Sequence, residues 1–241
     1  MRYRILKLYK LQSHSIFALF FFSFLLLTAA KVYSQTALKF NVADQYVTFG
    51  TASVIGTSTF TLECWIYKTG SGVTANTGSY GMNAIPIITK GRGEDDTPAN
   101  LNMNYFLGIN SSGKLAADFE DKKDGGNHPI NGITTLSNNV WYHIAATYDG
   151  TTWRIYLNGK LDATLLVGAF LPENTIIQHA GIATAMNSYG TATGYFQGVI
   201  DEVRIWNYAR NPSDILNNMN VELTSGTGLI GRWGFNEGSG T

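Results

Sequence analysis

The sequence predicts an all-β protein in which two antiparallel sheets pack face to face as a β-sandwich, with one short helix near residues 212–219. Three observations point to this fold class. Apolar residues recur at every second position in several short segments, as they do along half-buried strands. Turn-forming dipeptides join some of these segments at hairpin spacing. The composition, with 26 Gly, 5 Pro, 13% aromatic and only 14% charged residues, is that of strands and turns.

The first 34 residues predict a secretory signal peptide. Basic residues open the chain, an apolar run follows at 16–27, and small residues lead to Ser34. The apolar run has about a dozen residues, whereas a membrane-spanning helix needs about 20. An uncleaved membrane anchor is the alternative. We therefore expect residues 35–241 to form the mature domain and the protein to be secreted or held at the cell surface, meeting a membrane only during export.

The charge balance argues against a nucleic-acid-binding protein. The whole chain has 17 Lys and Arg against 17 Asp and Glu, a formal net charge of zero. The leader holds five of the basic residues and no acidic one, so 12 basic residues face 17 acidic ones after its removal. A net charge of −5 is the opposite of what nucleic-acid binding requires. The remaining 207 residues fit one all-β domain, since such domains often reach about 200 residues.

Strands follow one another along the rest of the chain. The clearest example is residues 59–67, where Phe60, Leu62, Cys64 and Ile66 fall on one face that should point into a core. In that position the only cysteine is expected to be a small buried hydrophobe, with a reactive thiol as the alternative. The other predicted strands lie at about 38–42, 45–49, 84–89, 104–110, 114–119, 140–148, 152–158, 161–166, 176–183, 194–207 and 229–235.

Turns and one helix connect these strands. Asp149-Gly150 and Asn158-Gly159 accept positive φ and predict antiparallel hairpins. Near residue 212 the pattern changes: Asn211 can cap a helix, Pro212 suits its first position, and Asp214 favours the positive helix end. The sequence therefore predicts a single short helix on an otherwise β body.

Read in order, these segments resemble the LamG-like jellyroll domains of the concanavalin A-like lectin/glucanase superfamily, which also contains laminin G domains and pentraxins. The resemblance covers about residues 37–241 and implies a concanavalin A-like jellyroll. It rests on the segments 37–41, 46–47, 60–66, 87–91, 154–160 and 229–240, on Trp141-Tyr142-His143-Ile144-Ala145-Ala146-Thr147-Tyr148-Asp149-Gly150, and on Phe196-Gln197-Gly198-Val199-Ile200-Asp201-Glu202-Val203-Arg204-Ile205-Trp206.

The last predicted strand, 229–235, has a particular place in this resemblance. In the family such a segment can close one domain or open the next, and the sequence halts within the motif at residues 238–241. We expect further domains of the same polypeptide. We also expect 229–235 to lie beside the first strand, where it would close the edge of a sheet.

The sequence gives little support for catalysis. Glycanases of this superfamily carry a Glu-x-Asp-x-x-Glu type pattern, because two carboxylates about 5 to 5.5 Å apart must act on the sugar. The nearest approach is Asp118 and Glu120 on one side of a strand, without a third acid. His143 lies inside a strand and is interpreted as a packed residue rather than a base.

The resemblance implies one structural calcium ion as a cofactor. Asp201 matches the position of an aspartate in a late strand, and Asp44 lies near the first strand, one position from the expected place, which Gln45 occupies. Calcium prefers six to eight oxygen ligands, so backbone carbonyls would supply most of them. A hydrogen-bonding aspartate is the alternative role for Asp201. Residues 184–195 contain no carboxylate, which argues against a pentraxin-like calcium site.

Long loops and tryptophans are the remaining candidates for ligand binding. The loops are predicted at 70–83, 91–102 and 120–131, and loops of about a dozen residues are often functional. Within them the residues nominated for ligand binding are Tyr80, Asp121, Asn127 and His128. The tryptophans are expected in the core or covering a sheet, with stacking on a sugar as the alternative: Trp65, Trp141, Trp153, Trp206 and Trp233.

The leading functional hypothesis is a secreted, non-catalytic recognition or adhesion module of a larger extracellular protein, with a glycan or an extracellular matrix or cell-surface ligand. The alternative is an accessory, carbohydrate-binding domain of a secreted polysaccharide-degrading enzyme whose catalytic part lies elsewhere. Catalysis by the domain itself is a third hypothesis, which hydrolysis of a panel of glycans would test.

Overall fold

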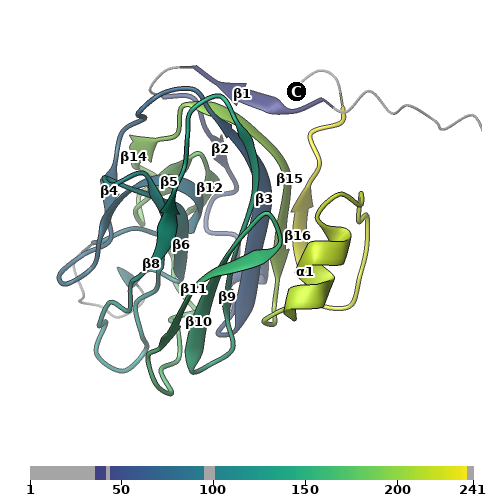
Figure 1. The fold of residues 1–241 in the computed structure, drawn as a ribbon. Helices are drawn as coiled ribbons and strands as arrows, with labels where there is room; N and C mark the ends of the chain where they lie inside the picture. The colour runs from purple at the N-terminus through teal and green to yellow at the C-terminus, as the bar shows by residue number, and fades with distance from the viewer. Residues whose placement is uncertain (1–35, 42–43, 95–100, 238–241) are drawn as a thin grey trace, which may run out of the picture. The chain divides into compact units, whose positions relative to one another are not determined.

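Two antiparallel sheets face one another and form a β-sandwich (Figure 1). The computed structural model describes residues 36–41, 44–94 and 101–237, so the predicted signal peptide lies outside the described residues. Sheet A has the strand order β1 (Leu38–Phe40), β15 (Gly198–Trp206), β3 (Phe60–Lys68), β9 (Trp141–Tyr148), β10 (Thr152–Leu157) and β11 (Lys160–Leu166), with β16 (Leu229–Trp233) also paired to β15.

Sheet B forms the second layer. Its strand order is β2 (Val47–Thr48), β12 (Ala180–Ile182), β5 (Asn83–Lys90), β6 (Tyr105–Asn110), β7 (Lys114–Asp118) and β8 (Ile130–Thr135), with β4 (Ala75–Asn76) paired to β5. A separate hairpin joins β13 (Thr184–Met186) to β14 (Ala192–Tyr195). All these pairs are antiparallel, so the predicted all-β sandwich is confirmed.

The core lies between the two sheets and contains the face predicted for β3. Phe60, Leu62, Cys64 and Ile66 are completely buried, together with apolar residues of β5, β6, β9 and β15. Burial, with a smaller effect of neighbouring carboxylates, raises the pKa of the Cys64 thiol well above its usual value. The prediction of a buried, structural cysteine is confirmed.

The helix and both hairpin turns also form where predicted. Helix α1 spans Pro212–Asn218, and the side chain of Asn211 caps it by accepting a hydrogen bond of 2.8 Å from the Asp214 N–H. Both Asn158 (φ 49°) and Gly159 (φ 74°) adopt the left-handed conformation that a tight hairpin needs. No helix in the described part of the chain is long and apolar enough to cross a membrane.

Strands β4, β8 and β13 were not predicted, and the bounds of several other strands were wrong in detail. Residues 194–207 form β14 and β15 rather than one strand, because the chain leaves the hairpin and enters sheet A between them. Residues 130–131, assigned to a loop, begin β8. The Asn131-Gly132 pair is typical of a turn, but here Ile130 is buried in the core, and this burial outweighs the turn preference.

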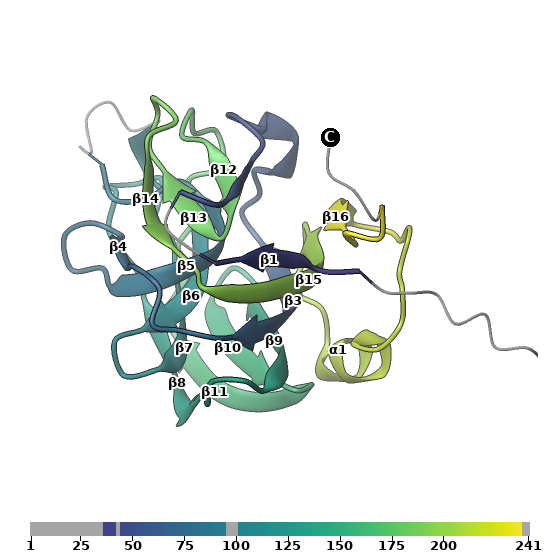
Figure 2. The same cartoon turned by 90° about the horizontal axis from the view of Figure 1, so that it is seen from above.

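Two strands share one edge of β15. β1 pairs with Ile200, Val199 and Gly198, and β16 pairs with the other half of β15, from Val203 to Trp206 (Figure 2). The last strand and the first strand therefore lie along the same edge of β15, as expected, each paired with a different half of it. Between the two lies a β-bulge, where the register with β3 shifts after Asp201 and Glu202 adopts a φ of 48°.

Candidate functional site

The outer face of sheet A carries an unusual set of side chains. On β3 the residues that alternate with the core face are Thr61, Glu63, Trp65 and Tyr67, and they point away from sheet B. Helix α1 and the segment after it cover part of this face (Figure 1). A covered outer face brings polar and aromatic groups out of water, so it can hold both a buried network and a pocket.

A buried ionic network lies beneath helix α1. The carboxylate of Glu63, which is fully buried, accepts hydrogen bonds from the Arg210 guanidinium at 2.7 Å and from the Trp206 indole at 2.9 Å. The guanidinium of Arg210 also lies over the Trp206 ring, 4.4 Å from its centroid. These contacts fix the chain that follows β15 onto sheet A.

His143 belongs to the same layer and is packed, as expected. Its ring lies 5.5 Å from that of Trp65 in an edge-on arrangement, and its Nε2 is 3.7 Å from Glu63. Burial, followed by the charges of Arg204 and Arg210, lowers the pKa of His143 to about 3. The imidazole is therefore neutral at physiological pH and is enclosed beneath the surface.

Beside this network a pocket opens on the same face, and we call it the tryptophan pocket. Its volume is about 440 Å³, within the range of about 300 to 1,000 Å³ usual for small-molecule sites. It is lined by residues from β3, β9 and β15, by Ala37 next to β1, and by the segment after α1: Ala37, Trp65, Trp141, Asp201, Glu202, Arg204, Met219, Asn220, Val221 and Glu222.

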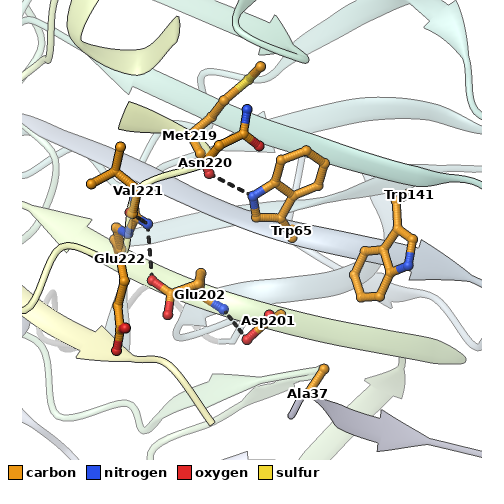
Figure 3. A pocket seen from close by; sticks show the side chains of 10 residues that line it. Ala37, Trp65, Trp141, Asp201, Glu202, Met219, Asn220, Val221 and Glu222 are labelled. Carbon is orange, nitrogen blue, oxygen red and sulfur yellow. Dashed lines mark hydrogen bonds and ion pairs between the residues drawn. The ribbon is translucent and has the colours of Figure 1, made fainter. Parts of the chain in front are cut away.

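Two indole rings form one side of this pocket (Figure 3). Trp65 is half-buried, and its Nε1 donates a hydrogen bond of 2.7 Å to the carbonyl of Met219, which holds the ring in place. Trp141 is 43% exposed and lies against Tyr67, with ring centroids 5.5 Å apart. The pocket therefore presents one fixed indole and one accessible indole.

Two carboxylates from the β15 bulge face the indoles (Figure 3). Glu202 is paired with Arg204 at 3.0 Å and with Arg232 at 2.8 Å, so its charge is compensated. Asp201 is paired with Trp65 of the neighbouring strand β3. One oxygen of the Asp201 carboxylate accepts a hydrogen bond of 2.8 Å from the Glu202 N–H. Burial raises the pKa of Asp201 to about 6, and the charge of Glu202 acts in the same direction, whereas the hydrogen bond from the Glu202 N–H and the charges of Arg232 and Arg204 act against it.

The residues nominated from the loops lie elsewhere, at one end of the sandwich. His128 and Asp121 form a pair 2.8 Å apart. Burial acts to raise the pKa of Asp121, but this pairing and hydrogen bonds from backbone N–H groups outweigh burial and lower the pKa. The Asn127 amide donates to the carbonyl of Ser79, at 3.0 Å, which joins the 120–131 loop to the 70–83 loop. The structure thus brings Asp121, Asn127 and His128 together and places them near the loop of Tyr80.

Tyr80 is the only one of the four nominated side chains that is fully accessible. It is 96% exposed and has a φ of 60°, a strained conformation for an aromatic residue. Asp121 is buried, and the ring of His128 packs against Phe119 and Phe170. These contacts show a structural role for the Asp121–His128 pair, whereas ligand binding by the four residues stays a prediction.

The two residues nominated for calcium have different surroundings. Asp44 is exposed and its carboxylate lies at the hydroxyl of Tyr195, whereas Asp201 belongs to β15 and lines the tryptophan pocket. Within the described ranges no three His, Cys, Asp or Glu side chains form a metal-binding group. A calcium ion at Asp201 stays a prediction.

The acids considered for catalysis are enclosed. Asp118 accepts hydrogen bonds from the Thr77 hydroxyl at 2.7 Å and from the His128 N–H at 2.9 Å, and it is completely buried. Glu120 is 1% exposed and accepts hydrogen bonds from Asn127 and from the backbone of Met103. A sugar polymer cannot reach either carboxylate in this conformation.

The tryptophan pocket was missed by the sequence reasoning, although one signal for it was present. Once Phe60, Leu62, Cys64 and Ile66 are assigned to the core face, Trp65 must point outward. An outward tryptophan on a strand needs either a cover or a ligand. Trp153 and Trp206 are buried and Trp233 packs against the core, as expected for most tryptophans of the chain.

Known proteins share this fold. The Laminin_G_3 family, described as the concanavalin A-like lectin/glucanases superfamily, matches residues 41–216. A comparison with curated protein sequences finds no match. The match includes Trp65, Trp141 and Asp201, whereas Ala37 and residues 219–222 of the tryptophan pocket lie outside it.

Several solved structures share the fold at low sequence identity. A candidate carbohydrate-binding protein from Bacteroides ovatus has a TM-score of 0.52 and 20% identity over 83% of this chain, which spans about half (49%) of that protein. The CBM40 of the Ruminococcus gnavus IT-sialidase, bound to α2,3-sialyllactose, has a TM-score of 0.56 and 14% identity, covering 76% of this chain and 96% of that one.

A third similar structure is a domain within a larger enzyme. NanB sialidase from Streptococcus pneumoniae has a TM-score of 0.57 and 15% identity over 78% of this chain, which corresponds to 28% of the sialidase chain. At these identities the similarity concerns the fold. The family match over residues 41–216 shows that the chain belongs to the concanavalin A-like lectin/glucanase superfamily.

Proposed function

We propose that this domain is an exported, non-catalytic glycan-recognition module and that the tryptophan pocket is its binding site. The observation that carries the proposal is the arrangement of three groups around one pocket: an accessible indole, Trp141, a fixed indole, Trp65, and a carboxylate oxygen of Asp201 that has no partner among the described residues. The fold is similar to that of a CBM40 bound to sialyllactose, which supports recognition of a carbohydrate.

The chemistry of the pocket suits a sugar. A pyranose has an apolar face of C–H groups that packs on an indole, and hydroxyl groups that donate hydrogen bonds to a carboxylate. Trp141 supplies the stacking surface, since it is accessible and held against Tyr67. Asp201 supplies an acceptor, because only one of its two oxygens has a hydrogen-bond partner within the described residues.

The proposal of a non-catalytic role rests on the enclosure of the candidate acids. Asp118 and Glu120 have hydrogen-bond partners inside the protein, and the two residues are 0% and 1% exposed. In the pocket itself, Glu202 is bound by two arginines, so it cannot readily act as a proton donor or nucleophile. The purified protein should therefore leave a panel of oligosaccharides and polysaccharides intact.

The experiment is a glycan-array and polysaccharide-pulldown assay with matched aromatic variants. Trp141→Ala should lower affinity about tenfold or more, because it removes the stacking surface. Tyr189→Ala is the control, since Tyr189 is 86% exposed and lies outside the pocket. Tyr80→Ala tests the loop residues. Loss of binding in the Tyr80 variant alone would move the site to the loops, and no binding to any glycan would reject the function.

An accessory role in a polysaccharide-degrading enzyme is a second candidate function. It is supported by the similar fold found within 28% of the NanB sialidase chain. In that role the domain should bind an extended polysaccharide more tightly than short oligosaccharides. A recognition or adhesion module should instead bind terminal oligosaccharides on the array, so comparing the two ligand forms distinguishes the functions.

A further inference from the structure

The electrostatics of the tryptophan pocket restrict the kind of sugar that it can accept. Of its lining residues, three are acidic and one is basic: Asp201, Glu202, Glu222 and Arg204. The basic residue is not available to a ligand. Arg204 is 1% exposed, and its terminal nitrogens donate to Glu202 and to the carbonyls of Asn218 and Val221.

The neighbouring arginine is also committed to protein partners. Arg232 donates from the same nitrogen to Glu202 at 2.8 Å and to Glu222 at 2.9 Å. Recognition of a carboxylate usually needs a guanidinium that can form two parallel hydrogen bonds with it. Neither Arg204 nor Arg232 can offer such a pair of donors without breaking an existing ion pair.

Asp201 is 8% exposed, and it is the pocket acid that lies next to an indole ring. The hydrogen bonds and ion pairs of the described residues engage one of its oxygens through the Glu202 N–H and leave the second without a partner. Asp201 on β15 is the cross-strand neighbour of Trp65 on β3. A sugar stacked on the indoles would therefore place its substituents beside this oxygen. A hydroxyl can donate to it, whereas a carboxylate would be repelled.

We propose that the tryptophan pocket selects non-acidic sugars and rejects sialic and uronic acids, with Asp201 as the specificity-determining residue. This inference rests on the proposed function and adds the chemical class of the ligand. It also separates this domain from the similar CBM40 structure, whose ligand, sialyllactose, is acidic.

One exposed cation near the pocket needs its own control. Lys39 lies two residues after Ala37 on β1 and is exposed, but it does not line the pocket. A flexible lysine could attract an acidic sugar from outside. Repulsion by the Asp201 carboxylate should outweigh attraction by Lys39, because Asp201 faces the indoles where the sugar would stack.

The experiment compares matched neutral and acidic sugars on the same protein. The probes are methyl glucoside and methyl glucuronide, methyl galactoside and methyl galacturonide, and lactose and 3′-sialyllactose, with affinity measured by titration calorimetry or on an array. For each pair that binds, the wild type should favour the neutral member about tenfold or more. Asp201→Asn should reduce this preference at least several-fold, because the amide carries no charge, while the control Asp124→Asn, at an exposed loop position, should keep it.

Two results would overturn the inference while leaving glycan binding intact. One is equal or tighter binding of the acidic member by the wild type, and loss of that binding in Lys39→Ala would show its cause. The other is a preference for neutral sugars that Asp201→Asn does not change. If neither member of any pair binds, and no other glycan binds, the proposed function fails and the inference fails with it.

Discussion

The buried carboxyl group of Asp118 should make the protein less stable at neutral pH than in mild acid. Asp118 is completely buried beneath the 70–83 loop, and burial raises its pKa from 3.8 to about 7, although hydrogen bonds from Thr77 and His128 act in the opposite direction. Folding therefore favours the protonated form. The stabilising effect of the neutral carboxyl is fully present below pH 3.8 and is lost as pH rises towards 7.

The size of the effect follows from the shift in pKa. A difference of roughly three pKa units corresponds to about 4 kcal/mol between the two protonation states at 1.36 kcal/mol per unit. This is an upper limit for the loss of unfolding free energy between about pH 4 and pH 8 that is due to this group. In Asp118→Asn the side chain is neutral at every pH, and its amide can donate to Thr77 and accept from the His128 N–H.

Urea denaturation of wild type and Asp118→Asn at pH 4.5 and 7.5 measures this difference. The variant should be close to the wild type, or somewhat less stable, at pH 4.5 and should gain about 2 to 4 kcal/mol relative to it at pH 7.5. Asp124→Asn, at an exposed site, should show the pH dependence of the wild type. Parallel pH profiles for wild type and Asp118→Asn would refute the reasoning.

Three further predictions concern the rest of the sandwich. Arg210→Ala should lower the free energy of unfolding, measured by urea denaturation, by about 3 to 5 kcal/mol, because it leaves the Glu63 carboxylate buried without its main partner. Combining Arg210→Ala with Glu63→Gln should recover part of this loss. Deleting residues 226–241 removes β16 and the contact of Trp233 with Phe49, whose ring centroids are 4.3 Å apart, so the melting temperature should fall sharply; an unchanged melt would show that β15 does not need this cover. If Asp201 holds a structural calcium ion, a chelator should lower the melting temperature and added calcium should restore it, whereas equal melting curves would exclude a stabilising ion.

The sequence predicted those features that depend on neighbouring residues. The core face of β3 follows from strict alternation of Phe60, Leu62, Cys64 and Ile66, and the start of α1 follows from the Asn211 cap and Pro212. In both cases the deciding residues lie within one element. The overall sandwich follows in the same way, because its strands repeat this alternation and turn-forming dipeptides join some of them.

The pocket could not be predicted in this way, because its residues come from three strands, from the residue before β1 and from the segment after α1. Asp201 and Trp65 become neighbours only through the pairing of β15 with β3, and Met219 reaches Trp65 only after α1 has packed on the sheet. The bulge that turns the β15 carboxylates toward the pocket depends on a left-handed conformation at Glu202, a residue type that gives no sign of it.

The distribution of tryptophans gives the protein two intrinsic optical probes. Trp153 is completely buried, with the rings of Phe60, Phe119 and Tyr148 about it, so its emission and near-ultraviolet circular dichroism should report unfolding of the core. Trp141 is accessible to a soluble quencher, and a sugar stacked on it would shield it. Acrylamide quenching can therefore follow occupancy of the pocket, while the dichroism of Trp153 confirms that the domain is still folded.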